Sequence, residues 1–544
     1  MGAINDFVTN RRKRRELNIA RLDKKLQQER ARAELARRTS DLVTNTGYSH
    51  GGASKSATWA KKYNSTSYSS KRDIEENRTT LRERSRDLAM NSPLAAAAIG
   101  TMRTSTVGAG LMPKPKIDYE FLRISKEEAE NLERDILKEF SLWAEKTFCD
   151  AADLNNFYEL QQIAFNDLMR NGKAFALIKY EDALPYMPYQ LKIKLIEADK
   201  ICSPNSFSGD YSGLDEKLEN GSRIMNGIEI TADGKVEAYY ISSTFPKEFE
   251  TGQKWTRVKK RGKLTGNPNI LHVFSAERAE QYRGVPFLAP VISSIKQITR
   301  YTEAEIMAAL VSSLFTVFIT TETGNDIAGY DGEEEESNAS GYGVSDDDDV
   351  MSLGSGTILQ LKTGEGVQTV APSHPSGNYE SFMTAMSTHV GAALGIAPEA
   401  LLKKFTNNYS ASKGALNETW KAVKTWRKWF VRDFCQEIYE LWFNEAVSKG
   451  RIKAAGYFTD PLIKSAYTNA TWNGPAQGYM NPLAEVNAAI ARIEAGLSTH
   501  EDECAMLNGS NFSDNVRTLE NENEKLKKAN GDTIDNQTDK VEKP

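Results

Sequence analysis

The sequence contains few cysteines, and none lies in a pattern that binds metal. Only Cys149, Cys202, Cys435 and Cys504 occur among 544 residues, far apart and without a CxxC pair. This usage predicts neither structural disulfides nor a zinc site, and it favours a reducing compartment. The five histidines show no HxxxH or HExxH spacing, so we expect no histidine-based metal centre.

Long apolar runs are also missing. The longest, near residues 308–319, has about twelve residues, whereas a helix that crosses a bilayer needs roughly twenty. The N-terminus starts with basic residues, but no apolar core follows them, which argues against secretion. No GxxxxGKS/T sequence is present, so we expect no P-loop ATPase in this chain. These features predict a soluble intracellular protein without a membrane partner.

Basic residues are missing from one long segment and concentrated in another. Residues 319–361 hold no Lys or Arg but eleven Asp and Glu, whereas residues 11–38 hold twelve Lys and Arg against four Asp and Glu. The net charge of −5 hides this segregation, which is typical of proteins with large charged partners. The densest acidic residues are Asp331, Glu333, Glu334, Glu335, Glu336, Asp346, Asp347, Asp348 and Asp349. They lack the DxDxDG register of a calcium loop, so a solvated segment is a better interpretation than a metal site.

The first part of the chain predicts a basic arm followed by an α+β region. A chain of 544 residues is too long for one simple core, so two or three structural regions are expected. Residues 1–80 are polar and basic and predict a flexible arm, although the first forty could form a charged helix. Residues 81–286 mix both element types. Strands are expected at 173–180, 190–198 and 269–274, with a hairpin around Asp233-Gly234.

Helix signals are clear within that region. Ser92 and Pro93 suit the N-cap and first position of a helix, so a preceding helix should end just before them. Ser125 and Glu128 have the spacing of a capping box. A further amphipathic helix should run over 157–170, where Asn171-Gly172 ends it.

The rest of the chain predicts longer helices. Apolar residues recur at helical spacing through 288–319. After the acidic segment, a short strand (356–361), a helix over 381–394, a very long helix over 415–449 and a polar tail without structure from 527 are expected. One face of the very long helix is apolar: Val423, Trp426, Phe430, Phe434, Ile438 and Leu441. Packing in a core or between subunits explains this face better than base stacking does.

A polar loop leads into that helix. Lys403, Lys404, Asn407, Asn408 and Tyr409 show no apolar pattern. Such side chains can touch phosphates without reading bases. From the residues alone, phosphate contact and an inert connection are equally well supported.

Short motifs in the chain also match those of serine β-lactamases. Ser410-x-x-Lys413 is accompanied by Lys-Thr-Gly at 362–364 and Ser-Asp-Asn at 513–515. Their order differs from the order in that enzyme class. Because motifs this short arise by chance in a long chain, serine acyl transfer is a weak alternative.

Seven longer blocks occur in one order between residues 80 and 510. They are RSRDLAMNSPLAAAAIGTMRTSTVGAGL (84–111), DAADLNNFYELQQIAF (150–165), ILHVFSAERAEQYRGVPFLAPV (270–291), NNYSASKGALNETW (407–420), FCQEIYELWFNEAV (434–447), WNGPAQGYMNP (472–482) and ARIEAGLSTHEDE (491–503). In content and order these blocks resemble the lambda-type portal proteins of tailed bacteriophages. A match over seven ordered blocks is far more specific than any single short motif.

The resemblance implies a non-enzymatic protein that needs no cofactor. Such portals form a ring, usually a homo-dodecamer, at one capsid vertex, and double-stranded DNA passes through its channel during packaging and ejection. The implied partners are the terminase large subunit, the major capsid protein and scaffold, head-completion or adaptor proteins, and DNA without sequence specificity. Assembly in the host cytoplasm and a final location in the virion are expected.

The resemblance also implies a division of the chain into parts. It assigns the wing to 81–286, the first stem helix to 287–319, the clip to 320–372, the second stem helix to 373–397, the tunnel loop to 398–414, the long wing helix to 415–455 and the crown region to 456–526. The arm (1–80) and a disordered tail (527–544) lie outside these parts.

The family architecture gives roles to two groups of residues. Lys403, Lys404, Asn407, Asn408 and Tyr409 would face DNA from the tunnel loop, and the nine acidic residues above would form the clip surface. Two rival functions stay open: a hydrolase that uses Ser410 and Lys413, and a regulator that binds specific DNA sequences.

Overall fold

The computed structural model describes residues 2–43, 58, 66–204, 216–246, 248, 253–314, 318–321, 365–368, 378–405, 409–477 and 481–538. The chain divides into two units, 1–69 and 70–544. In the first unit, helix α1 (Gly2–Val43) occupies most of the described part. The side chains described along α1, Lys13 and residues 15–34, are all exposed. The possible charged helix of the basic arm is therefore present.

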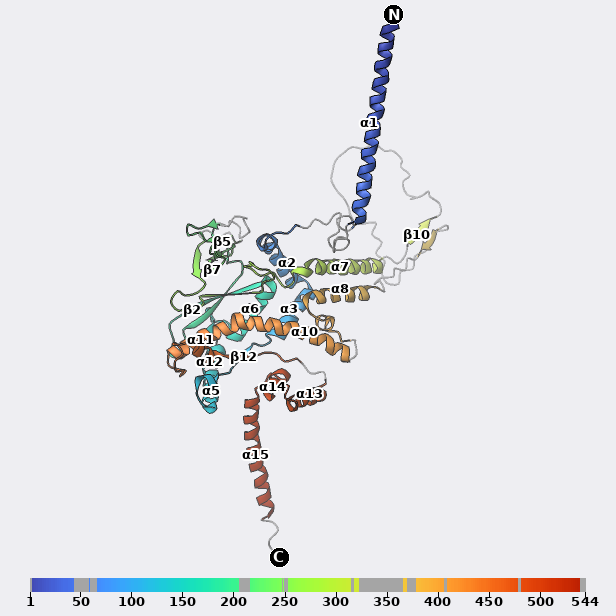
Figure 1. Ribbon diagram of the computed structural model, residues 1–544. Coiled ribbons are helices and arrows are strands. Elements are labelled where there is room, and N and C mark those ends of the chain that lie inside the picture. The colour runs from blue at the N-terminus through green and yellow to red at the C-terminus, as the bar shows by residue number, and fades with distance from the viewer. Residues whose placement is uncertain are drawn as a thin grey trace, which may run out of the picture. The chain divides into compact units, whose positions relative to one another are not determined.

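The second unit is rich in helices (Figure 1). Its α-helices are α2 (Arg78–Asn91), α3 (Pro93–Thr106), α4 (Tyr119–Leu122), α5 (Lys126–Ala144), α6 (Phe157–Asn171), α7 (Ile292–Leu314), α8 (Tyr379–Leu394), α9 (Pro398–Leu402), α10 (Tyr409–Phe430), α11 (Gln436–Ser448), α12 (Pro461–Thr468), α13 (Pro482–Glu494), α14 (His500–Leu507) and α15 (Phe512–Thr538). Short π-helical turns lie at η2 (Lys71–Glu75) and η5 (Val431–Cys435), and 3₁₀ turns at η3 (Thr147–Cys149) and η4 (Ala289–Val291).

The strands form small antiparallel sheets. They are β1 (Met112–Pro115), β2 (Lys173–Tyr180), β3 (Leu191–Ile196), β4 (Glu216–Lys217), β5 (Arg223–Met225), β6 (Ile228–Ile230), β7 (Val236–Ser242), β8 (Trp255–Lys259), β9 (Ile270–Phe274), β10 (Phe318–Thr321), β11 (Glu365–Gln368) and β12 (Ala470–Asn473). One sheet has the order β3-β2-β9 and another the order β4-β5-β6-β7-β8. Together with the helices they confirm the predicted helix-rich α+β fold.

Local capping determines several helix ends at the predicted positions. Ser125 and Glu128 form a complete capping box at the start of α5. The break between α2 and α3 falls at Ser92, which takes the N-cap position, although its side chain makes no capping hydrogen bond. Helix α6 ends before Gly172, whose φ of 76° is left-handed and costs glycine little.

The main core is built around α10, η5 and α11. These segments form one uninterrupted helical stretch from Tyr409 to Ser448 with a π-helical turn inside it. Of the apolar face predicted there, Val423, Phe430, Phe434, Ile438 and Leu441 are buried and Trp426 is partly buried. This confirms the packing interpretation of the tryptophan-bearing helix.

The same stretch corrects one prediction. We expected the helix to begin at about residue 415 and the tunnel loop to extend to 414. Helix α9 occupies Pro398–Leu402, and α10 begins at Tyr409, so Ser410 and Lys413 are helical. Only Tyr409 of the polar residues that suggested a loop belongs to α10, while Lys403 and Lys404 follow α9.

The predicted first stem helix is shorter than expected. Helix α7 ends at Leu314, and residues 318–321 form strand β10, which pairs with β11. Phe318 and Ile319 are therefore in a strand. Thr316, Val317 and Thr320 show why the sequence is ambiguous, because β-branched residues favour strands. The strand predicted at 356–361 lies outside the described residues.

Two C-terminal predictions also need correction. Strand β12 pairs with β1, with Met112 opposite Asn473, and Tyr467 in the preceding helix belongs to the main core. The expected boundary at 455 therefore separates segments that the fold joins. The tail predicted to lack structure from 527 begins within α15, which continues to Thr538. Its charged residues at i and i+4, such as Glu524 and Lys528, support a solvated helix.

Candidate functional site

The backbone between α8 and α10 is described as far as Phe405. Helix α8 ends at Gly395, which has a left-handed φ of 68°. The backbone N–H of Ala397 then donates to Thr419 Oγ1 of α10 at 2.9 Å. Leu401 of α9 is buried against the main core, so α9 is held in place. Residues 402–405 follow this fixed part of the chain and are exposed, and we call them the projection.

The described residues of this projection are exposed. Lys403, at the C-terminus of α9, has a left-handed φ of 53°. Lys404 Nζ lies 2.6 Å from Glu380 Oε1 of α8, and this contact lowers the pKa of the Glu380 carboxyl. Phe405 is 55% exposed. Two basic side chains and one aromatic ring are therefore presented to solvent together.

The structure covers only part of the predicted DNA-facing group. Lys403 and Lys404 are described and exposed, and their role in DNA contact stays a prediction. Asn407 and Asn408 lie outside the described residues, and Tyr409 opens α10 with a side chain that is not described. Phe405 was missed by sequence reasoning, since an aromatic residue beside a core helix reads as part of the core.

Arg427, in the second half of α10, joins three segments of the chain. Arg427 Nε donates to Thr106 O at 3.0 Å, and Nη2 donates to Ser105 O at 2.7 Å and to Pro475 O at 2.8 Å. Its guanidinium also lies over the Trp420 ring, 5.6 Å from the centroid. Burial lowers its pKa to about 10, which leaves it charged at neutral pH. Arg427 thus joins α10 to α3 and to the segment after β12.

Helices α7 and α8 lie side by side (Figure 1). The ring of Tyr301 packs on Phe382 at 4.7 Å between centroids, and Tyr379 Oη donates to Thr302 Oγ1 at 3.2 Å. Beyond these contacts the described part of α7 exposes apolar side chains. They are Ile306 at 54%, Met307 at 58% and Leu310 at 51% exposure. A single chain therefore leaves an apolar surface on α7.

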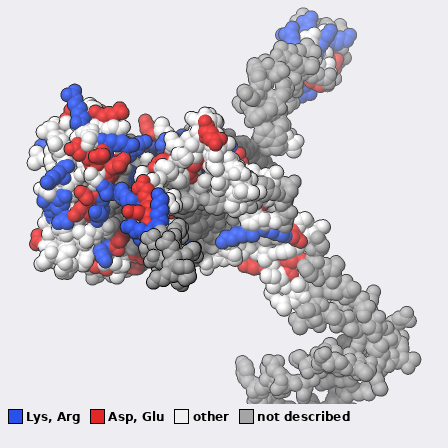
Figure 2. Space-filling model, turned by 90° about the horizontal axis from the view of Figure 1, so that it is seen from below, with Lys and Arg blue, Asp and Glu red and all other residues white. Residues whose placement is uncertain are grey.

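Nine acidic residues were predicted to form the clip surface. All nine residues, Asp331, Glu333, Glu334, Glu335, Glu336, Asp346, Asp347, Asp348 and Asp349, lie outside the described residues. Figure 2 shows basic and acidic side chains interspersed over the described surface on one face. The strong segregation of charge lies instead in residues 11–38 and 319–361 of the sequence.

The Ser/Lys pair lies in the first turns of α10. Ser410 is exposed on the first turn of α10, and Lys413 Nζ forms an ion pair with Glu485 Oε1 of α13 at 3.0 Å. This ion pair engages the amine that the hydrolase hypothesis would use as its base. Ser513, Asp514 and Asn515 begin α15, and residues 362–364 lie outside the described part.

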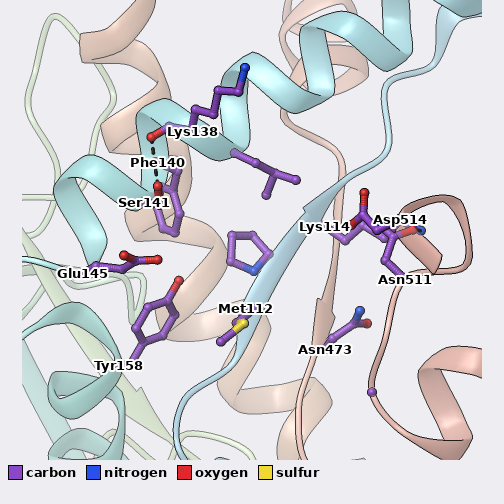
Figure 3. Close-up of a pocket in the computed structure, with 13 residues that line it drawn as sticks. Met112, Lys114, Lys138, Phe140, Ser141, Glu145, Tyr158, Asn473, Asn511 and Asp514 are labelled. Carbon is purple, nitrogen blue, oxygen red and sulfur yellow. Dashed lines mark hydrogen bonds between the residues drawn. The ribbon is translucent and has the colours of Figure 1, made fainter. Parts of the chain in front are cut away.

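A cavity of about 390 Å³ lies between α5, β1, β12 and the segment that joins α14 to α15. In Figure 3, Lys114, Asn511 and Asp514 gather on one side and Ser141, Glu145 and Tyr158 on the other. Lys114 Nζ forms an ion pair with Glu501 and donates to Asn511 Oδ1 at 3.2 Å. The lining comes from segments far apart in the sequence, so no local signal predicted it.

The described part of the chain lacks two other kinds of feature. Its His, Cys, Asp and Glu side chains form no group of three or more that could hold a metal ion. Its helices include none with both the length and the apolar character needed to cross a membrane.

Comparison with known proteins gives consistent matches. The family described as phage portal protein, lambda family, matches residues 56–427. The chain is similar to the portal protein of Escherichia phage N15, with 24% identity over 84% of this chain and 86% of that protein. It is also similar to portal protein B of Escherichia phage lambda, with 23% identity over 84% of this chain and 86% of that protein.

Solved structures give weaker similarity. A chain in the virion of a native gene transfer agent particle aligns over 79% of this chain and 92% of its own length, with 12% identity and a TM-score of 0.39. An HK97-family phage portal protein from Corynebacterium diphtheriae aligns over 67% of this chain and 98% of its own length, with 10% identity and a TM-score of 0.23.

Proposed function

This chain belongs to the lambda family of phage portal proteins, and we propose that it forms a ring of about twelve subunits at one capsid vertex. Double-stranded DNA would pass through the ring during packaging and ejection. Family membership supports this proposal most directly. The exposed apolar surface on α7 supports it independently, because identical neighbours would bury it.

The helix pair α7 and α8 would form the stem that surrounds the channel. Ile306, Met307 and Leu310 each leave half or more of their area exposed in one chain. In a ring, the α7 of one subunit would pack on the next subunit, and burying such side chains gives roughly 1.5–3 kcal/mol each. Strand pair β10–β11 lies at the far end of α7, where the clip would begin.

The projection after α9 would reach the DNA. Lys403 and Lys404 are exposed on a segment that follows the buried Leu401 and the hydrogen bond from Ala397 to Thr419. Repeated around a ring, two lysines per subunit would contact phosphates without reading the base sequence. Contacts that are few and solvent-screened are what a conduit needs, since tight binding would stop the DNA.

The acidic segment would form the clip surface. Nine clustered carboxylates per subunit would give on the order of a hundred negative charges around a ring. They would keep DNA away from the wall, or attract basic faces of the terminase large subunit or of head-completion and adaptor proteins. The major capsid protein and scaffold would be further partners, with assembly in the host cytoplasm and a final place in the virion.

The mass of the purified full-length protein tests the ring. We expect particles of about twelve times 60.6 kDa with an axial hole in electron micrographs. A protein that stays a monomer or dimer at every salt and protein concentration would contradict the proposal.

A charge-removing variant tests the role of the projection. The double variant Lys403→Ala, Lys404→Ala should assemble normally, because both side chains are exposed, yet package less DNA into particles. The matched control is Lys421→Ala, Lys428→Ala, which removes two exposed lysines of α10 behind the projection. If both double variants package equal amounts of DNA, the projection does not contact the DNA during packaging.

A further inference from the structure

A group of charged side chains is buried where η2 and α2 meet the two larger sheets. Glu75 is 1% exposed, Arg78 4%, Lys173 0% and Arg283 0%. These residues come from three separate parts of the sequence. Such side chains are almost never fully buried unless each charge is paired, so their partners decide what this cluster can do.

The backbone brings these side chains to one place. Lys173 and Phe175 of β2 alternate by two residues and so share a face of the sheet. Arg283 lies over the ring of Phe175, 5.2 Å from its centroid. Arg283 is fixed there because the next residue, Gly284, lies against Gly172, which immediately precedes β2.

Part of this group has partners within the chain. Arg78 Nε lies 3.3 Å from Glu75 Oε2, and Asn226 Nδ2 donates to the same oxygen at 2.8 Å. Arg283 Nη2 donates to the backbone carbonyls of Ile201, at 2.7 Å, and Asn226. These contacts hold Glu75 and one edge of the Arg283 guanidinium.

The rest of the group has donors without acceptors. In the described part of the chain, Lys173 Nζ, Arg78 Nε and the Nε and Nη1 atoms of Arg283 have no hydrogen-bond partner, and among the acceptors Glu75 Oε1 has none either. Three cations face a single carboxylate, that of Glu75, which leaves an excess positive charge inside the protein. Nearby Arg82 does not correct this balance, because its own partner is Asp199 at 2.6 Å.

Excess buried charge of this kind is costly. An unpaired buried ion costs several kcal/mol even after the protein relaxes around it. Burial and the neighbouring cations, Arg78 first, lower the pKa of Arg283 to about 9 and lower that of Lys173 well below its usual value. Burial is the main cause of both pKa shifts, and the neighbouring cations add to it.

We propose that a small monovalent anion, with the size and charge of chloride, binds among Lys173, Arg283 and Arg78 and completes this cluster. An anion accepts hydrogen bonds without needing a donor, which suits the unpartnered Lys173 Nζ and Arg283 Nε and Nη1. A carboxylate from a neighbouring subunit does not suit the site, because the side chains are buried within their own chain. The bound anion would join η2 and α2 to β2 and to the loop that carries Arg283.

Thermal unfolding of the full-length protein in different salts tests this proposal. We expect the wild-type Tm to be higher in sodium chloride or bromide than in sodium gluconate at equal ionic strength, by roughly 2–4 °C. Gluconate is too large for a site enclosed by buried side chains. Lys173→Met should abolish this difference, whereas Lys194→Met, at an exposed position of the neighbouring strand β3, should keep it.

Crystals of the wild-type protein grown in bromide give a second measurement that needs no variant. An anomalous peak beside Lys173 Nζ supports the site. Equal Tm values in chloride and gluconate together with no anomalous peak would mean that water alone fills the cluster, and would overturn the proposal. If the Tm difference between chloride and gluconate persists in Lys173→Met, the anion binds elsewhere, and this result would also overturn the proposal.

Discussion

Asp167 of α6 shows how strongly burial shifts the pKa of a single side chain. Burial and the carboxylate of Glu197 raise its pKa from 3.8 to about 7, with Asp199 acting in the same direction. Arg86 and Arg170 oppose this effect without cancelling it. Because desolvation penalises the charged form, Asp167 binds its proton more tightly in the folded chain than in the unfolded one.

This proton gives the stability a defined pH dependence. The contribution is full below pH 3.8 and is lost as the pH rises through about 7, and it amounts to at most roughly 4 kcal/mol. Asp167→Asn should therefore raise the Tm above that of wild type at pH 8 and flatten the Tm profile between pH 4 and 7. The control Asp135→Asn changes the charge equally at an exposed site. If the Tm of both variants equals that of wild type at pH 8, the pKa of Asp167 is not raised by burial.

At the scale of the elements, the contact between two glycines joins α6 and β2 to the loop before α7. A Cβ atom on Gly284 would lie 1.8 Å from the carbonyl oxygen of Gly172. A Cβ atom on Gly172 would lie 2.4 Å from the carbonyl carbon of Val285. Phe287 N–H then donates to Met169 O at 3.0 Å, which extends the contact. Both positions therefore require glycine, because the two backbone segments approach too closely to leave room for a side chain.

Gly284→Ala tests this close approach. The methyl group collides with backbone that has no room to move, so we expect a loss of roughly 1–3 kcal/mol or more in unfolding free energy. Gly100→Ala is the matched control, because a Cβ there meets nothing within 4 Å in α3. Helix propensity predicts a gain of up to roughly 1 kcal/mol for the control. Urea unfolding of both variants measures the difference, and similar midpoints would contradict the backbone contact.

At the scale of the whole molecule, one chain does not bury all of its apolar surface. The main core is extensive, yet Ile306 and Met307 of α7 and Phe382 of α8 are exposed at 54%, 58% and 41%. These residues come from two neighbouring helices, and exposed apolar residues grouped in this way mark interaction sites. A second copy of the chain is the partner that the proposed ring would supply.

Charge placed on this surface should block assembly while leaving the chain folded. Ile306→Glu combined with Met307→Glu should shift the purified protein to monomers and small oligomers, with an unchanged far-UV circular dichroism spectrum. Leu264→Glu is the control, since Leu264 is 99% exposed but lies in the loop between β8 and β9. Light scattering after gel filtration measures the mass. Assembly of the double variant like the control would show that α7 is not an interface.

The sequence by itself determined the features that depend on neighbouring residues. Ser125 with Glu128, Pro93 and Gly172 mark helix ends because capping and φ preferences act within a few residues. Strand β2 was predicted with the bounds it has in the structure, and the apolar face of α10 and α11 was predicted from its helical spacing. The family was evident because ordered blocks of sequence carry information that single motifs lack.

Only the tertiary structure decided which distant segments meet. The pairing of β12 with β1, the contacts of Arg427 with carbonyls of α3, and the approach of Arg283 to Lys173 have no local signal. The start of α10 at Tyr409 and the ion pair of Lys413 with Glu485 likewise depend on packing against other helices. The reason is physical: local preferences amount to a few tenths of a kcal/mol per residue, whereas burial against a remote surface contributes several times more and overrides them.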